Sequence, residues 1–251
     1  MEWYYILALL GTGLAAGFIN ANAGGGSMLT LPLLMFLGLP ANVANGTNRV
    51  AILLQNVIGV NTFRQKKVLD ITTDYRLAIP AVAGSVIGAL FAVEISEALL
   101  EKIITGLMVG MLLLVILKPE VWVKEHAGAV NPQPTFWQYI IFFFIGFYGG
   151  FIQMGVGFLL LAGLVLGCGY NLVKANAIKL FIVLIYTVFT LGIFMFNDQV
   201  DWKAGLILAA GNMTGAWLGA RFAVKGGAKY VRYVLILSLI IVILNLFGVF
   251  R

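Results

Sequence analysis

Long apolar stretches, separated by short polar or glycine-rich interruptions, occupy most of the sequence. Their apolar residues are continuous, as in 230–250, whereas a transmembrane β-barrel would need apolar and polar residues to alternate. A helix of this length can cross about 30 Å of hydrocarbon. The pattern predicts an all-α polytopic membrane protein with 8–10 membrane segments, drawn from the stretches 4–20, 23–38, 41–63, 76–93, 98–117, 137–152, 155–168, 172–196, 204–222 and 230–250.

The composition excludes a water-soluble domain. Of the 251 residues, 61% are apolar and 10% are charged, whereas soluble domains carry about 25% charged residues. The net charge of +6 does not indicate nucleic-acid binding, because no basic cluster is interleaved with aromatic residues. A single cysteine excludes a disulfide framework. We therefore expect contact with the lipid bilayer and neither a metal nor another cofactor.

The sequence contains an internal repeat. When it is shifted by 131 positions without a gap, its first half superposes on its second half. The repeat predicts two copies, 1–117 and 136–251, joined by the polar, proline-containing linker 118–135. The matched positions include Gly24 with Gly155, Gly26 with Gly157, Gly38 with Gly169, Asn45 with Asn176, Asp70 with Asp201, Gly84 with Gly215 and Gly88 with Gly219.

The charges of the loops indicate that the two copies have opposite orientations. In the first copy, the loop after the third segment is basic and the loop after the fourth is acidic; in the second copy, the order is reversed. The residues of the first copy are Arg64, Lys66, Lys67 and Arg76, followed by Glu94, Glu97 and Glu101. Those of the second copy are Asp198 and Asp201, followed by Arg221, Lys225, Lys229 and Arg232. Because Lys and Arg concentrate on the cytoplasmic side, we predict inverted-topology repeats with a cytoplasmic linker and both termini outside, in the periplasm. The first two segments of each copy are short and glycine-interrupted, so they either both cross the membrane or form a re-entrant hairpin.

Two cations, Arg49 and Lys179, fall within apolar spans, and no carboxylate accompanies them. A buried charge costs about 3 kcal/mol or more unless something compensates it, so an anionic substrate is its natural partner. Glycine turns would add backbone N–H donors at helix starts, and Asn20, Gln55 and Asn56 are further polar residues in the spans. The candidate substrate-binding residues are Asn22, Gly24, Gly25, Gly26, Ser27, Asn45, Thr47, Asn48, Arg49, Gln153, Gly155, Gly157, Asn176 and Lys179.

Simpler interpretations compete with this site. Arg49 and Lys179 could extend to a membrane interface if the helix boundaries lie a turn away from those predicted. Glycines four residues apart, in 84–88, 106–110 and 215–219, are typical of close helix packing, either within the chain or in a homodimer. If the two cations bind substrate instead, neutralising either one should abolish anion binding.

A series of motifs resembles that of the sulfite exporter TauE/SafE family, also called the 4-toluene sulfonate uptake permease family. Its members here are Gly17-Phe18-Ile19, Gly24-Gly25-Gly26-Ser27, Leu31-Pro32, Gly38-Leu39-Pro40, Ala44-Asn45-Gly46-Thr47-Asn48-Arg49 and the loop 63–70, with weaker counterparts at 155–157 and 174–179. The resemblance implies transport of sulfur-containing oxyanions, such as sulfite, sulfoacetate or other organosulfonates, across a prokaryotic inner membrane.

We therefore expect a secondary transporter for a small anion, a sulfur oxyanion, that works by alternating access between inverted repeats. A passive anion channel is the alternative, because it would share the polar turns. An enzyme is disfavoured, since the spans offer no base to activate Ser27 or Cys168. No nucleotide-binding Gly-x-x-x-x-Gly-Lys motif is present.

Overall fold

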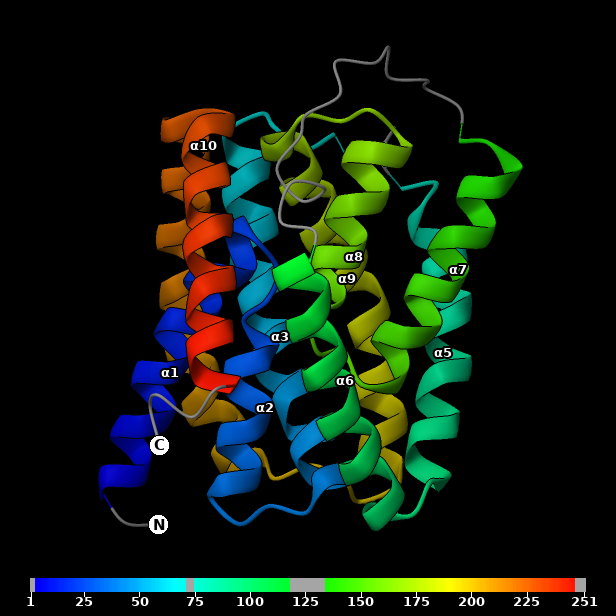
Figure 1. Ribbon diagram of the computed structural model, residues 1–251, viewed down its shortest axis with the longest axis vertical. Helices are drawn as coiled ribbons and strands as arrows, with labels where there is room; N and C mark the ends of the chain where they lie inside the picture. Colours follow the sequence, from blue (N-terminus) through cyan, green and yellow to red (C-terminus); the bar gives the residue numbers. More distant parts are fainter. Residues whose placement is uncertain (1–2, 71–74, 118–133, 247–251) are drawn as a thin grey trace.

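The computed structural model describes residues 3–70, 75–117 and 134–246, except for the side chains of 108–117, 227–229, 231–232 and 234–246. The predicted linker 118–135 therefore lies almost wholly outside the described residues. Within them, all regular structure is helical (Figure 1). The elements are α1 (Trp3–Asn22), α2 (Ser27–Phe36), α3 (Ala41–Gln65), α5 (Ala78–Glu94), α6 (Glu97–Leu117), α7 (Phe136–Phe151), α8 (Val156–Ala162), the π-helical turn η2 (Gly163–Gly167), α9 (Leu172–Phe196) and α10 (Trp202–Leu246).

The helices form a bundle in which α3 and α9 pack against each other and α1 and α7 lie on partner helices. In Figure 1 α1 and α3 rise from the lower end of the molecule, whereas α7 and α9 descend from the upper end. Among the described helices, α1 and α9 are both long and apolar enough to cross a membrane, and α2, α5, α7 and α8 with η2 are shorter apolar helices. These elements follow the predicted hydrophobic segments closely.

Glycine allows two helix pairs, α1 with α10 and α5 with α7, to bring their backbones into contact. A Cβ on Gly17 would overlap the carbonyl group of Asn212, and one on Gly150 would overlap that of Ser85. The glycines of 84–88 contact α7 in the same way, so their packing is within the chain. Gly106 instead faces open space among the described residues, so the structure shows no packing within the chain at this position.

Two glycine turns break the chain between α1 and α2 and between α7 and α8. Gly24 and Gly155 have positive φ values of 95° and 70°, which L side chains rarely adopt. The turns meet in the interior, where a Cβ on Gly157 would overlap the backbone of Gly24. The first two segments of each half are therefore separate helices whose connections touch.

Helix α10 is continuous where the sequence predicts two segments, 204–222 and 230–250. It bends sharply near Gly226, where a Cβ placed on this glycine would overlap the Cβ of Tyr230. In a straight helix, Cβ atoms four residues apart lie about 5–6 Å from each other. Accordingly, the beginning of α10 and its red end both point to the lower end of Figure 1. The predicted reversal is present, but the chain keeps helical hydrogen bonds through it.

Candidate functional site

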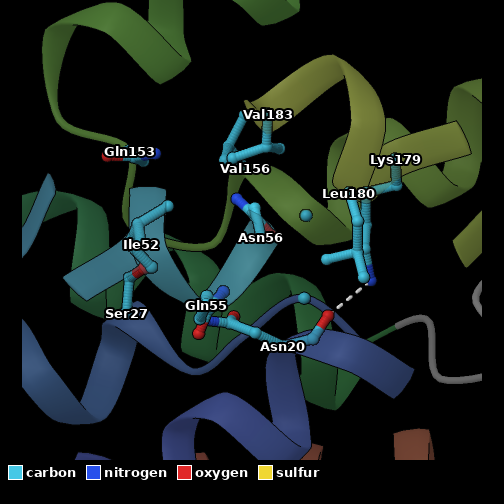
Figure 2. Close-up of a pocket in the computed structure, with 12 residues that line it drawn as sticks. Asn20, Ser27, Ile52, Gln55, Asn56, Gln153, Val156, Lys179, Leu180 and Val183 are labelled. Atoms are coloured by element: carbon cyan, nitrogen blue, oxygen red, sulfur yellow. Dashed lines mark hydrogen bonds between the residues drawn. The ribbon is translucent and has the colours of Figure 1, made fainter. Parts of the chain in front are cut away.

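A small, partly open pocket lies where the two glycine turns meet the middle of α3 and α9 (Figure 2). Glycine at the turns brings backbone to the pocket wall, and the two long helices supply side chains. The lining residues are Asn20, Gly24, Ser27, Ile52, Gln55, Asn56, Gln153, Val156, Gly157, Lys179, Leu180 and Val183.

Lys179 supplies the positive charge of the pocket. Its side chain is 1% exposed, and its Nζ donates to the backbone oxygen of Asn20 at 2.7 Å and to Oδ1 of Asn176 at 2.5 Å. An ammonium group has three protons to donate, so one remains for a ligand. No Asp or Glu of the described residues lines the pocket.

Amide groups and the hydroxyl group of Ser27 provide the other polar side chains of the pocket. Asn56 is fully buried, and neither its Oδ1 nor its Nδ2 has a hydrogen-bond partner among the described residues. Gln153 donates from Nε2 to Oγ1 of Thr187 at 3.1 Å, while its Oε1 has no partner there. Figure 2 shows Asn56 between Val156 and Gln55. Buried polar groups are normally hydrogen-bonded, so these groups are available to a bound water or a polar ligand.

Asn20 connects the first glycine turn to α3 and α9. Its Oδ1 accepts from the backbone N of Gly26 at 2.7 Å, and its Nδ2 donates to Oε1 of Gln55 at 3.3 Å. Its backbone oxygen, at the end of α1, accepts from Lys179. One residue thus fixes the turn, a lining amide and the ammonium group relative to one another.

Arg49 lies outside the pocket. Its guanidinium group donates to the backbone oxygens of Gly149 at 3.3 Å and Gly150 at 2.6 Å, near the end of α7. It also donates to Oγ1 of Thr190 at 3.0 Å, and its central carbon lies 4.4 Å from the ring centroid of Phe194. A cation at a helix C-terminus satisfies orphan carbonyls and the negative end of the dipole. The geometry of Arg49 is therefore that of a helix clamp.

Neither cation extends to an interface, because Arg49 is 0% and Lys179 1% exposed within the protein. This finding excludes the snorkelling interpretation for the described structure.

The sequence matches a known protein family. The model of the sulfite exporter TauE/SafE family matches residues 9–246. The chain belongs to this family. It is similar to a probable membrane transporter protein, ORF9, of Sinorhizobium sp., with 30% identity over 88% of this chain and 84% of the relative. It is similar also to the probable membrane transporter protein YfcA of Escherichia coli K12, with 30% identity over 88% and 82%. YunE of Bacillus subtilis, another probable membrane transporter protein, is 24% identical over 95% of each chain. No solved structure matches.

The TauE/SafE family and its relatives, together with the apolar helices, make the protein a multi-pass membrane transporter. The predicted substrate-binding residues that line the pocket are Gly24, Ser27, Gln153, Gly157 and Lys179. Asn176 does not line it but accepts a hydrogen bond from Lys179. The structure thus gathers residues from both sequence halves at one place.

The other predicted residues do not line the pocket. Several connect helices: Asn45 donates to the backbone oxygen of Phe151 at 2.7 Å, Thr47 Oγ1 accepts from the backbone N of Asp201 at 2.8 Å, and Asn48 Oδ1 accepts from Oγ1 of Thr30 at 2.7 Å. Asn22 donates to the backbone oxygen of Phe18 at 2.9 Å. Gly25, Gly26 and Gly155 form the turns themselves, and a Cβ on Gly26 would overlap the carbonyl of Ala16.

Three lining residues, Asn20, Gln55 and Asn56, are absent from the predicted set, although each is a polar residue in an apolar span. Helical spacing is the signal that could have found two of them. Gln55 and Asn56 lie seven and eight residues after Asn48, which places them near one face of α3, two turns further along.

Proposed function

We propose that this TauE/SafE protein is a secondary transporter that carries a small anion, a sulfur oxyanion such as sulfite or an organosulfonate, across the cell inner membrane. One observation supports it above all: the ammonium group of Lys179 is buried at the pocket with one free donor and no described acid beside it. Ser27, at the start of α2, adds the positive end of a helix dipole. Sulfur oxyanions are supported by the family's description.

Alternating access is the mechanism that we propose, between inverted repeats at 1–117 and 136–251. Backbone geometry supports the repeat, because positive φ values recur 131 residues apart. The pairs are Gly24 and Gly155 (95° and 70°), Gly38 and Gly169 (93° and 77°), and Lys67 and Asp198 (58° and 56°). The opposite directions of α1 and α7, and of α3 and α9, support the inversion (Figure 1).

Helix contacts support the repeat in a second way. The first helix of each half lies on the fourth helix of the other half, α1 on α10 and α7 on α5. On α5, Gly84 lies against the backbone of Phe143 and Phe147 on α7. On α10, Gly211 lies in the same way against the backbone of Leu10 and Leu14 on α1. Gly88 and Gly215 form a second pair with equivalent backbone contacts. The equivalent of Gly84 is therefore Gly211, one helical turn before the Gly215 that the ungapped shift predicts. The longer connection between α3 and α5 accounts for the offset.

The orientation follows from the positive-inside rule. The upper end of Figure 1, where α3 ends and α10 bends, corresponds to basic stretches of the sequence, whereas α5 and α9 end below in acidic stretches. We propose that the upper end is cytoplasmic, together with the linker 118–135, and that both termini are periplasmic. The chemistry is translocation alone, with no bond made or broken in the substrate.

Exchange kinetics test this proposal against a passive anion channel. Purified protein in liposomes should take up labelled sulfite or sulfonate faster when the lumen holds unlabelled substrate, because a carrier returns faster when loaded. Lys179→Met should abolish uptake, whereas Lys203→Met, which removes an exposed lysine at the start of α10, should not. Uptake without stimulation from the opposite side would favour the channel. Equal uptake by wild type and Lys179→Met would contradict the assigned pocket.

A further inference from the structure

The pocket has more hydrogen-bonding capacity than a simple oxyanion can satisfy. A fully deprotonated sulfonate or sulfate offers acceptors only, which suit the free proton of Lys179 and an amide NH₂ group. The pocket also contains a free acceptor, because Oδ1 of Asn56 has no partner among the described residues. Some group of the bound molecule should donate to it.

The orientation of the Asn56 amide does not affect this conclusion. Oxygen and nitrogen of an amide are assigned from the hydrogen bonds that they make, and both side-chain atoms of Asn56 are without partners. Whichever way the group is turned, it presents one donor and one acceptor to the pocket. Its side chain is 0% exposed, so bulk water does not satisfy it.

The charges set a second condition. Lys179 is the one cation that lines the pocket among the described residues. Arg49, the other buried cation, is occupied by the carbonyl oxygens of Gly149 and Gly150. A monoanion neutralises the ammonium group, whereas a dianion leaves one negative charge buried without a partner, at a cost of several kcal/mol.

We propose that the pocket selects a singly charged anion that carries a hydrogen-bond donor of its own, such as a hydroxyl group beside a sulfonate. The anionic oxygens bind Lys179, and the donor binds Asn56. This inference rests on the proposed function, because it names the class of anion that the same pocket accepts. It makes Asn56 a specificity-determining residue.

A matched pair of sulfonates tests the proposal by calorimetric titration of the full-length protein in detergent. Isethionate and 1-propanesulfonate have the same charge and nearly the same size, but isethionate has a hydroxyl where the other has a methyl group. Leaving a buried polar group unpaired costs about 1–3 kcal/mol. Isethionate should therefore bind about tenfold more tightly or better, and sulfoacetate, a dianion of similar size, should bind more weakly than isethionate.

Asn56→Leu should remove the preference for isethionate while 1-propanesulfonate still binds. Asn212→Leu is the matched control, since Asn212 is also 0% exposed and has both side-chain atoms unpaired, but lies on α10 outside the pocket. This variant should keep the preference. Melting temperatures without ligand show whether each variant is folded, and the wild-type comparison decides the question even if a variant is not.

The outcomes separate this inference from the function on which it rests. Equal wild-type affinity for the two monoanions, tighter binding of sulfoacetate, or an isethionate preference retained in folded Asn56→Leu would overturn the donor and charge rule. In each case binding that depends on Lys179 would leave the proposed transport of anions standing. No binding of any of these anions, or of sulfite, would overturn the proposed function itself.

Discussion

At the scale of single residues, the two buried cations have different partners. Arg49 holds the end of α7, whereas Lys179 holds the end of α1 and also reaches the pocket. In the 131-residue alignment Lys179 matches Asn48, one position before Arg49. One residue corresponds to about 100° around a helix, so the two side chains leave their helices in different directions. The sequence identifies both cations, but only packing distinguishes their directions.

Arg49→Met should destabilise the protein, because the carbonyl oxygens of Gly149 and Gly150 lose their donor. A buried acceptor left without a partner costs about 1–3 kcal/mol, so the melting temperature in detergent should fall by several degrees. Arg64→Met, an exposed arginine in the last turn of α3, is the control and should change little.

Bound anion should still raise the melting temperature of folded Arg49→Met, because this side chain does not line the pocket. This expectation differs from the one drawn from the sequence, where neutralising either cation abolishes binding. An Arg49→Met protein of normal stability that no longer responds to anions would restore the sequence-based expectation.

At the scale of elements, the hydrophobic pattern locates the helices well because apolar length is what a span requires. Helix α9 begins and ends at the predicted residues, 172 and 196, and α3 begins at the predicted Ala41. The pattern misses the continuity of α10 at Gly226 and the π-helical turn 163–167. Both are features of local backbone geometry, which hydrophobicity does not encode.

Two glycines on α1 test how closely the helices pack. Gly17→Ala should destabilise the protein by about 1–3 kcal/mol, because the new Cβ would overlap the carbonyl of Asn212 on α10. Gly11→Ala is the matched control on the same helix, where nothing lies within 4 Å of the added Cβ. It should be neutral or stabilising, since alanine is favoured over glycine in helices by about 1 kcal/mol.

Thermal melting of both variants in the same detergent measures this difference. Equal melting temperatures for Gly17→Ala and Gly11→Ala would contradict the contact between α1 and α10.

At the scale of the whole molecule, matched residues along the sequence predict a repeat, but they do not predict which helix packs on which. Glycine matches give no information on which helix packs on which, and the ungapped shift misaligns α5 and α10 by one turn. The position of the pocket could not be predicted from the sequence for the same reason. Its residues Asn20, Asn56 and Lys179 come from three helices whose meeting point depends on that packing.

Cysteine labelling tests the proposed orientation of the molecule. In a Cys168→Ser background, Asp198→Cys should react with a membrane-impermeant maleimide in intact cells, because the connection from α9 to α10 is placed outside. Lys66→Cys, in the connection from α3 to α5, should react only after the membrane is permeabilised. Both positions are exposed. Labelling of both positions from the same side would contradict the inverted repeats. Labelling of Lys66→Cys in intact cells, with Asp198→Cys reacting only after permeabilisation, would show that the proposed inside and outside are interchanged.

The central claim is that the buried ammonium group of Lys179 binds an anionic substrate. The most direct measurement is the melting temperature of the purified protein against rising concentrations of sulfite, sulfate, isethionate and acetate, since a ligand that binds only the folded state raises it. A selective, saturable rise with a sulfur oxyanion, lost in Lys179→Met and retained in Lys203→Met, is the predicted result. A rise of the same size in Lys179→Met, or no rise with any anion, would contradict the account.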